Sequence, residues 1–76
     1  MKVFVLFNNN HMDYEDYEEW IDGIFDSLEK AENRKQEIIQ TELGCLVEPA
    51  SGEEVTVDGN DVRMYRPLRI EIHTIE

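Results

Sequence analysis

The sequence predicts an α+β domain in which a small antiparallel sheet carries one helix packed on one face. Three observations indicate this fold. Residues 3–7 and 68–72 have strand patterns, residues 28–43 place apolar side chains at helical spacing, and residues 55–64 have the pattern of a small hairpin. The elements therefore follow the order β-β-α-β, with the extra hairpin before the last strand. The 76 residues, 1–76, are expected to form a single domain.

The first strand is expected at residues 3–7, a continuous run of aromatic and branched apolar residues. Alternation gives it two apolar faces, one with Phe4 and Leu6 and the other with Val3, Val5 and Phe7. A strand of this kind is normally covered on both sides. One helix covers one side only, so the segment 46–66 or a second copy of the protein is expected to cover the other. Residues 8–11 are expected to end the strand, because asparagine runs favour turns.

The second strand is expected at residues 20–25. Simple alternation places Trp20 and Ile24 on one face and Ile21 and Phe25 on the other. Gly23 lies inside this strand, where we expect a bulge or a close backbone approach. The acidic segment between the two strands then becomes the connection of a long hairpin.

The helix is expected to begin at Asp26 or Ser27, because Asp26 and Glu29 have the spacing of a capping box. Gly44 suits the position just after its end. Its apolar stripe is completed by the aliphatic stem of one lysine, and comprises Leu28, Ala31, Lys35, Ile38, Ile39 and Leu43.

The segment 45–66 after the helix is expected to be an insertion built around a hairpin. Its strands contain residues 55–57 and 62–64, and the tight turn falls at residues 58–61. Pro67 ends this unit. The final strand is half-buried, since Leu68, Ile70 and Ile72 alternate with polar residues.

The stretch IDGIFDSLEKA at residues 21–31 follows an MKVFVL opening and an acidic aromatic loop. This combination resembles a group of small uncharacterised bacterial and phage-encoded α+β proteins with a G-I-F-x-S-x-E-K-A junction between strand and helix. The resemblance covers residues 1–40 and, more loosely, the final strand, but not residues 45–66. It implies the fold. It carries over no catalytic residue, because no activity is established for that group.

The charge of the chain restricts its partners. The formal net charge is −11, and no cation lies between Lys2 and Lys30. Such a field repels phosphate backbones and anionic lipids, so we expect neither direct nucleic-acid binding nor membrane binding, and a basic protein surface is favoured. No apolar stretch approaches the roughly 20 residues that span a bilayer. The single cysteine, Cys45, and the lack of a signal-peptide pattern predict a cytoplasmic protein.

The candidate partner-binding site is the segment between the first two strands. It comprises Asp13, Tyr14, Glu15, Asp16, Tyr17, Glu18, Glu19 and Trp20. In one interpretation, carboxylates along an extended chain imitate phosphates and occupy a basic groove. Alternate residues of a strand lie about 6.8 Å apart, which is twice the phosphate spacing of about 3.4 Å. In the other interpretation, this is a solvated hairpin loop whose aromatic side chains fold back on the sheet.

Catalysis, metal ions and cofactors are not expected. An EF-hand that began at Asp13 would need glycine and glutamate where Glu18 and Ile24 stand. The chain has no close cysteine or histidine pair for zinc, no phosphate-binding loop and no nucleophile elbow. Cys45 and a histidine could be drawn as a catalytic nucleophile and its base, but any chain with one cysteine and two histidines allows that pairing. A lone cysteine after a helix is usually a core residue.

Two functions from different classes remain. The first is a small acidic protein-interaction module without catalysis, encoded by a phage or mobile element, that binds a basic host protein and in its sharpest form mimics nucleic acid. The second is a homodimeric accessory domain, in which the second face of strand 3–7 forms the interface and the loop is only solvated. Arg63, Arg66 and Arg69 are expected on different faces, paired with surface carboxylates or with the acidic loop of a second copy.

Overall fold

The computed structural model describes residues 1–12, 14–57 and 59–76, and of Tyr14 it describes the backbone. The prediction of an α+β fold is confirmed. The elements are β1 (Lys2–Asn9), a 3₁₀ turn (Tyr14–Asp16), β2 (Glu19–Phe25), α1 (Leu28–Glu42), β3 (Glu54–Val57), β4 (Asp61–Met64) and β5 (Arg69–Thr74).

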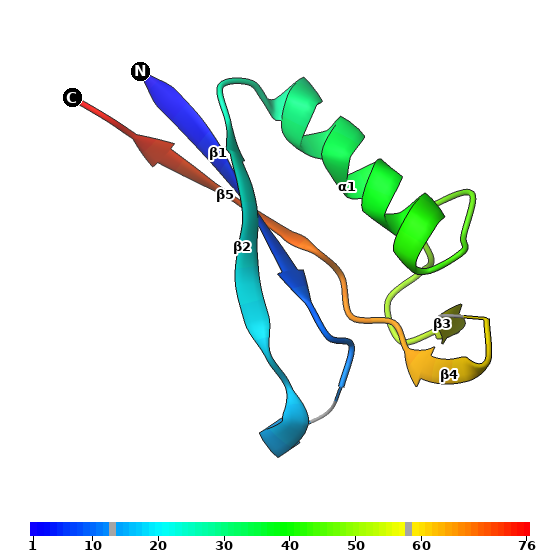
Figure 1. Cartoon of the computed structure of the whole chain (residues 1–76). Coiled ribbons are helices and arrows are strands. Elements are labelled where there is room, and N and C mark those ends of the chain that lie inside the picture. The colour runs from blue at the N-terminus through cyan, green and yellow to red at the C-terminus, as the bar shows by residue number, and fades with distance from the viewer. Residues whose placement is uncertain (13, 58) are drawn as a thin grey trace.

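The strands form two antiparallel sheets. The larger has the order β2-β1-β5, so the acidic segment does connect two paired strands, and β3 and β4 form the predicted hairpin. Helix α1 packs over β1 and β2, and the hairpin lies beyond the C-terminal end of the helix (Figure 1). In the described parts of the chain, no helix has the length and apolar character that crossing a bilayer requires.

The core lies between the sheet and the helix, and the hairpin extends it. Its buried members are Leu6, Ile38, Ile39, Leu43, Val55, Val57, Tyr65 and Leu68. The segment 46–66 therefore packs on the helix side, and the expectation that it might cover the second face of the sheet is wrong. The physical reason is that Val55 and Val57 bury against the end of the helix stripe.

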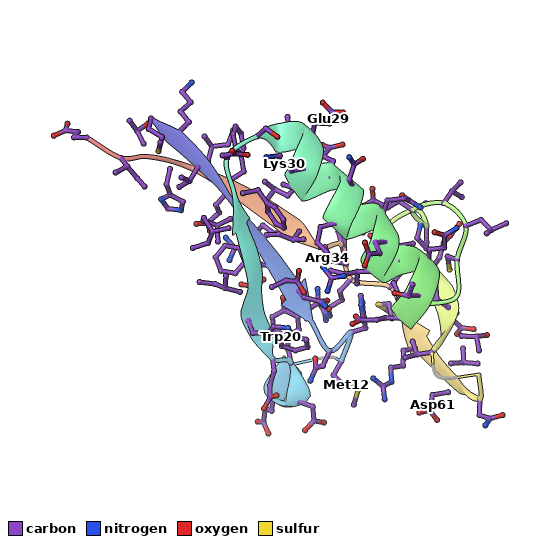
Figure 2. The ribbon with its side chains drawn as sticks, turned by 45° about the horizontal axis from the view of Figure 1, so that its top comes forward. Met12, Trp20, Glu29, Lys30, Arg34 and Asp61 are labelled. Atoms are coloured by element: carbon purple, nitrogen blue, oxygen red, sulfur yellow. The ribbon has the colours of Figure 1, made fainter. Side chains whose placement is uncertain are left out.

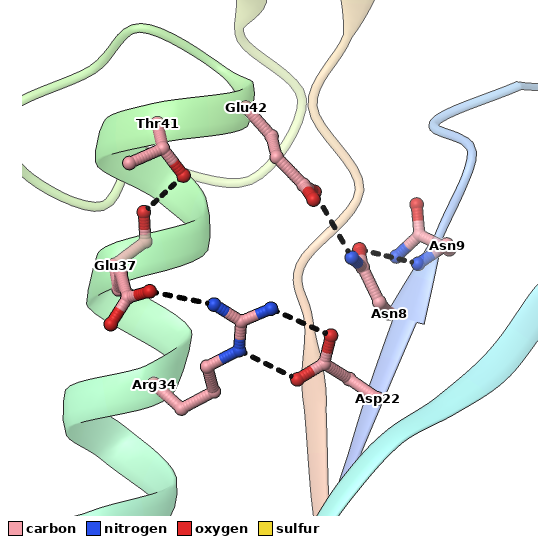
Figure 3. Close-up of polar contacts among 7 residues, drawn as sticks. All are labelled: Asn8, Asn9, Asp22, Arg34, Glu37, Thr41 and Glu42. Carbon is pink, nitrogen blue, oxygen red and sulfur yellow. Dashed lines mark hydrogen bonds and ion pairs between the residues drawn. The ribbon is translucent and has the colours of Figure 1, made fainter.

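Strand β1 is longer than predicted, because Asn8 and Asn9 continue it instead of ending it. Both asparagines are buried. Their amide groups find partners. Asn8 Nδ2 donates to Glu42 at 3.2 Å (Figure 3). Asn9 Nδ2 donates to the carbonyl oxygen of Arg66 at 3.2 Å. A buried amide is tolerated when it is hydrogen-bonded. The left-handed conformation falls on His11 instead, at φ 57°.

Strand β2 contains a bulge next to Gly23. Gly23 pairs with Leu6 while Ile21 pairs with Phe7, so Asp22 is the extra residue. The helix holds this bulge, because the Arg34 guanidinium donates to both Asp22 carboxylate oxygens at 2.9 and 3.3 Å (Figure 3).

The bulge corrects the predicted faces of β2. Trp20 lies opposite Asn8 and shares the helix-side face with Phe25. Ile21 and Ile24 share the other face, which we call the outer face. Simple alternation fails here because a bulge shifts the alternation of side chains by one residue.

The helix begins at a different cap from the one predicted. Ser27 is the N-cap, and its Oγ accepts a hydrogen bond from the Lys30 N–H at 3.2 Å. Asp26 instead pairs with the Lys30 ammonium at 2.9 Å, so the proposed capping box is wrong. Leu28 is 45% exposed and lies outside the buried stripe, also against expectation. Gly44 follows the helix at φ 71°, as predicted.

The outer face is partly covered by a side chain of its own sheet. The Arg69 guanidinium carbon lies 4.1 Å from the centroid of the Phe7 ring. Val5 is buried between its neighbours, whereas Ile21 and Ile24 remain more than half exposed. The Arg69 side chain thus covers part of the outer face, which a second copy of the protein was expected to cover.

Candidate functional site

The acidic loop, residues 10–19, connects β1 to β2. Of its predicted partner-binding residues, Asp13 lies outside the described residues, and so does the side chain of Tyr14. The others are exposed: Glu15, Asp16, Tyr17, Glu18, Glu19 and Trp20. Residues 14–16 form a 3₁₀ turn. The extended-chain spacing assumed for phosphate mimicry is therefore wrong at this point, because a 3₁₀ turn rises only about 2 Å per residue.

A single asparagine side chain organises this loop. Asn10 Nδ2 donates to the carbonyl oxygen of Asp16 at 2.7 Å. Its Oδ1 accepts from the N–H groups of Met12 and Glu18, each at 3.1 Å. The Asn10 N–H also donates to the carbonyl oxygen of Glu18 at 3.1 Å. Asn10 thus ties the first, middle and last parts of the loop together, as asparagine does in local turns.

Three arginines from the C-terminal half reach the same loop. Arg63 donates to the carbonyl oxygen of Asn10 at 3.2 Å, and Arg66 Nε donates to that of Met12 at 2.7 Å. Arg69 pairs with Glu19 at 2.5 Å. Sequence reasoning missed this convergence, because a spacing of three in an extended chain separates the side chains. Residues 65–68 lie between β4 and β5, outside any strand, and the chain turns there.

Tyr17 and Glu19 are bound within the protein. The Tyr17 hydroxyl donates to Glu19 at 3.0 Å, and the Arg66 guanidinium lies 5.3 Å from the Tyr17 ring centroid. The hydrogen bond from Arg69 lowers the pKa of Glu19. Partial burial and the bond to Glu19 raise the pKa of Tyr17. Glu71, which contacts Arg69 and His73, extends this network along β5.

His11 locks the loop to the segment before β5. Its Nδ1 accepts from the Arg66 N–H at 3.1 Å, and its ring stacks on Tyr65 with centroids 5.7 Å apart. Burial and the nearby charge of Arg63 lower the pKa of His11. The imidazole is therefore neutral near pH 7, with its proton on Nε2. Cys45 is held elsewhere, where its thiol faces the carbonyl oxygen of Leu43 at 3.7 Å.

These contacts divide the acidic loop into two parts. The loop base is formed by Asn10, His11, Met12, Tyr17 and Glu19, which are bound by the arginines or by each other. The loop tip is formed by Glu15, Asp16 and Glu18, which are exposed. Among the described residues, no basic side chain forms an ion pair with a tip carboxylate.

Trp20 lies beside the loop and is 44% exposed. Figure 2 shows Trp20 and Met12 at the end of the sheet that carries the loop. An open cleft of about 310 Å³ lies next to the indole, and its lining includes Glu42, His11 and Arg63. In the described parts of the chain, no three histidine, cysteine or acidic residues are grouped to hold a metal ion.

Comparison of the chain with protein-family models, with curated proteins and with solved structures finds no match.

Proposed function

We propose that the protein is a small interaction module without catalysis, which binds the basic, nucleic-acid-binding surface of another protein through its loop tip. The observation that carries this proposal is the unequal neutralisation of the acidic loop. Three arginines contact the base, whereas Glu15, Asp16 and Glu18 are exposed, and no basic side chain forms an ion pair with them among the described residues. An anionic patch of this kind attracts a cationic surface and steers its approach.

The order of the loop supports a binding role over simple solvation. A loop that only solubilises needs no internal bonds, but Asn10 makes four hydrogen bonds that shape this one. A loop already held in one shape loses less conformational entropy on binding, so more of the contact energy appears as affinity. The backbone at Asp16 and Glu18, which carries two of the tip carboxylates, is therefore held before the partner binds.

Trp20 and the adjacent cleft add a place for a basic side chain. The exposed indole offers a π-face for a lysine or arginine, and Glu42 supplies a carboxylate in the lining of the same cleft. Of the two basic residues in this lining, His11 is neutral, and the charge of Arg63 is partly offset by its contacts with the carbonyl oxygen of Asn10 and with Asp61. Exposed tryptophans next to charged residues are frequent anchors of interfaces.

The test is a competition experiment. Proteins of a bacterial lysate that are retained on phosphocellulose are mixed with labelled duplex DNA, and the protein is added to displace the DNA. We expect wild type to release DNA and the variant Glu15→Gln/Asp16→Asn/Glu18→Gln to fail. The matched control is Glu29→Gln/Glu32→Gln/Glu54→Gln, which changes the net charge equally at exposed positions away from the loop. Equal competition by both variants would refute a role for the tip.

A homodimeric accessory domain is the second candidate. The exposure of Ile21 and Ile24 on the outer face favours it. In this case Ile24→Lys is expected to convert a dimer into a monomer in sedimentation, while the tip variant remains dimeric. A wild type that sediments as a monomer excludes this candidate.

A further inference from the structure

We propose that two copies of the chain associate through the free edge of β5, which joins their sheets into one continuous antiparallel sheet. This inference is independent of the proposed binding by the loop tip. It also uses a different surface from the outer face, on which the accessory-domain candidate depends.

The two edge strands of the sheet, β2 and β5, differ in how well they are protected against pairing with a further strand. β2 carries the bulge at Asp22, and a bulge hinders the pairing of a further strand. β5 contains no glycine or proline and pairs with β1 without a register shift, from Phe7 opposite Arg69 to Lys2 opposite Thr74. Among the described residues, no strand pairs with the other side of β5. An unprotected regular edge is a template for another strand.

The hydrogen bonds at the chain ends show which backbone groups this edge offers. The Ile75 N–H donates to the carbonyl oxygen of Met1 at 2.7 Å, and the Met1 amino group donates to that of Ile75 at 3.1 Å. In an antiparallel ladder, such doubly bonded pairs recur at every second residue. The backbone groups of residues 73, 71 and 69 therefore face β1, and those of Ile70, Ile72 and Thr74 face outward.

The side chains of β5 fit a second copy of the same strand. Strands related by a two-fold axis pair antiparallel, and residues directly opposite each other share a sheet face. An axis at Ile72 aligns residues 70–74 of both copies and sets Glu71 of each copy opposite His73 of the other. Opposite-charge and hydrogen-bonding pairs at such positions stabilise a sheet.

The neighbouring registers are less favourable. An axis at His73 sets Ile72 opposite Thr74 and not opposite its own copy, and it aligns fewer residues of the strand. An axis at Glu71 sets this carboxylate opposite its own copy, and like charges directly opposite each other are destabilising. An axis at Ile70 sets Leu68 opposite Ile72, but Leu68 precedes the strand and is buried in the core. The register with the axis at Ile72 is therefore the one we infer.

Exposed apolar surface supports the same register. Ile72 lies opposite Phe4 on the helix side of the sheet, but α1 packs over β1 and β2, and Ile72 is left 59% exposed. In the paired sheet it lies against Ile72 of the second copy. Burial of these side chains adds to the backbone hydrogen bonds.

The net charge makes this association depend on salt in a distinctive way. Two copies that each carry −11 repel each other, while on β5 itself the charges of Arg69 and Glu71 balance. Screening shortens the range of this repulsion, from about 10 Å at 0.1 M salt to about 3 Å at 1 M. Added salt is therefore expected to strengthen self-association, whereas it weakens binding of the loop tip to a basic partner.

The test combines sedimentation with cysteine cross-linking. Wild type at increasing concentration and salt is expected to shift from 9.0 kDa to twice that mass, and Ile72→Lys to remain monomeric with an unchanged circular dichroism spectrum. In a Cys45→Ser background, single variants Ile72→Cys, Glu71→Cys and Ile24→Cys are oxidised. We expect a covalent dimer from Ile72→Cys only. Ile24 is the matched control, because it is 62% exposed on the opposite edge strand.

Several outcomes overturn the inference. If wild type stays monomeric at high salt, association through β5 is excluded. Preferential cross-linking of Glu71→Cys means a different register, and dissociation by Ile24→Lys but not by Ile72→Lys places the interface on the outer face. None of these three results affects the DNA competition experiment, so failure of this inference and failure of the proposed function are distinguishable.

Discussion

The base and the tip of the acidic loop differ although they are interleaved in the sequence. Glu18 and Glu19 are adjacent, yet Glu19 is bound to Arg69 and Tyr17, and the Glu18 side chain points to solvent without a basic partner among the described residues. Carboxylates of the same loop thus serve two purposes. The carboxylate of the base, Glu19, contributes to the folded structure, and those of the tip are left exposed. The difference predicts that stability and binding respond to different substitutions.

The largest effect on stability is expected from substitution of Asn9, the last residue of β1, which precedes the loop base. Its Oδ1 accepts from the His11 N–H at 2.8 Å, and its Nδ2 donates to the carbonyl oxygen of Arg66. Asn9→Ala leaves these buried groups unpaired, at a cost of about 2–3 kcal/mol in the free energy of unfolding. Urea denaturation measures this change. The control Asn33→Ala, at an exposed helix position, should leave the midpoint unchanged or slightly raised.

The base should also make stability depend on pH through His11. The folded state holds the pKa of His11 below its ordinary value of about 6.5. The unfolded chain therefore binds the proton more readily, and stability is full above about pH 6.5 and falls as the pH drops below it. Thermal unfolding between pH 7.5 and 5 measures this slope.

The matched variants for this slope are His11→Asn and His73→Asn. Asparagine tolerates the left-handed backbone of position 11 but does not titrate, so the slope should disappear in the first variant. It should persist in the second, because that variant leaves His11 and its contacts unchanged. Equal slopes in both variants would contradict the role assigned to His11.

A smaller loss of stability is expected when Asn10, which connects the loop base to the loop tip, is substituted. Asn10→Ala removes the acceptor for the Met12 and Glu18 N–H groups at a partly exposed site, which costs about 1 kcal/mol. The amide hydrogens of these two residues should exchange faster, while those of α1 stay protected. DNA competition should weaken severalfold although the charge is unchanged. Unaltered competition would mean that the order of the loop does not contribute to binding.

The smallest effect on stability is expected from the tip. Glu15→Gln/Asp16→Asn/Glu18→Gln alters exposed side chains without ion pairs in the described structure, so the free energy of unfolding should change by less than about 0.5 kcal/mol. The same variant is expected to lose DNA competition entirely. A clear loss of stability would show that the tip, like the base, belongs to the folding of the domain.

Periodicity was sufficient to predict the elements whose side chains obey one simple rule. The helix, the hairpin at 54–64 and the final strand each show regular spacing, and each forms where it was expected. The stem of Lys35 fills the helix stripe as predicted, with its ammonium paired to Glu48 at 3.2 Å. Apolar spacing works here because burial against one core decides the position of most of these residues, although Leu28 and Ile72 stay 45% and 59% exposed.

Residues whose roles depend on distant partners escaped this reasoning. Asn8 and Asn9 continue β1 only because Glu42 and the segment before β5 satisfy their amides. The faces of β2 differ from the prediction because the strand has a bulge at Asp22, which Arg34 of the helix stabilises. The arginines at 63, 66 and 69 meet one loop only after the chain turns between β4 and β5. Such contacts are long-range in sequence, and local propensity does not encode them.

The four hydrogen bonds of Asn10 have a consequence for how such a protein can change. Because the frame of the loop is anchored through one side chain and backbone groups, the residues at 15, 16 and 18 are exchangeable without rebuilding the frame. Under the proposed binding by the loop tip, the specificity of the protein would be set at these positions, much as variable loops are carried by an antibody framework. A change of target would then need substitutions at only a few positions, with the rest of the fold left as it is.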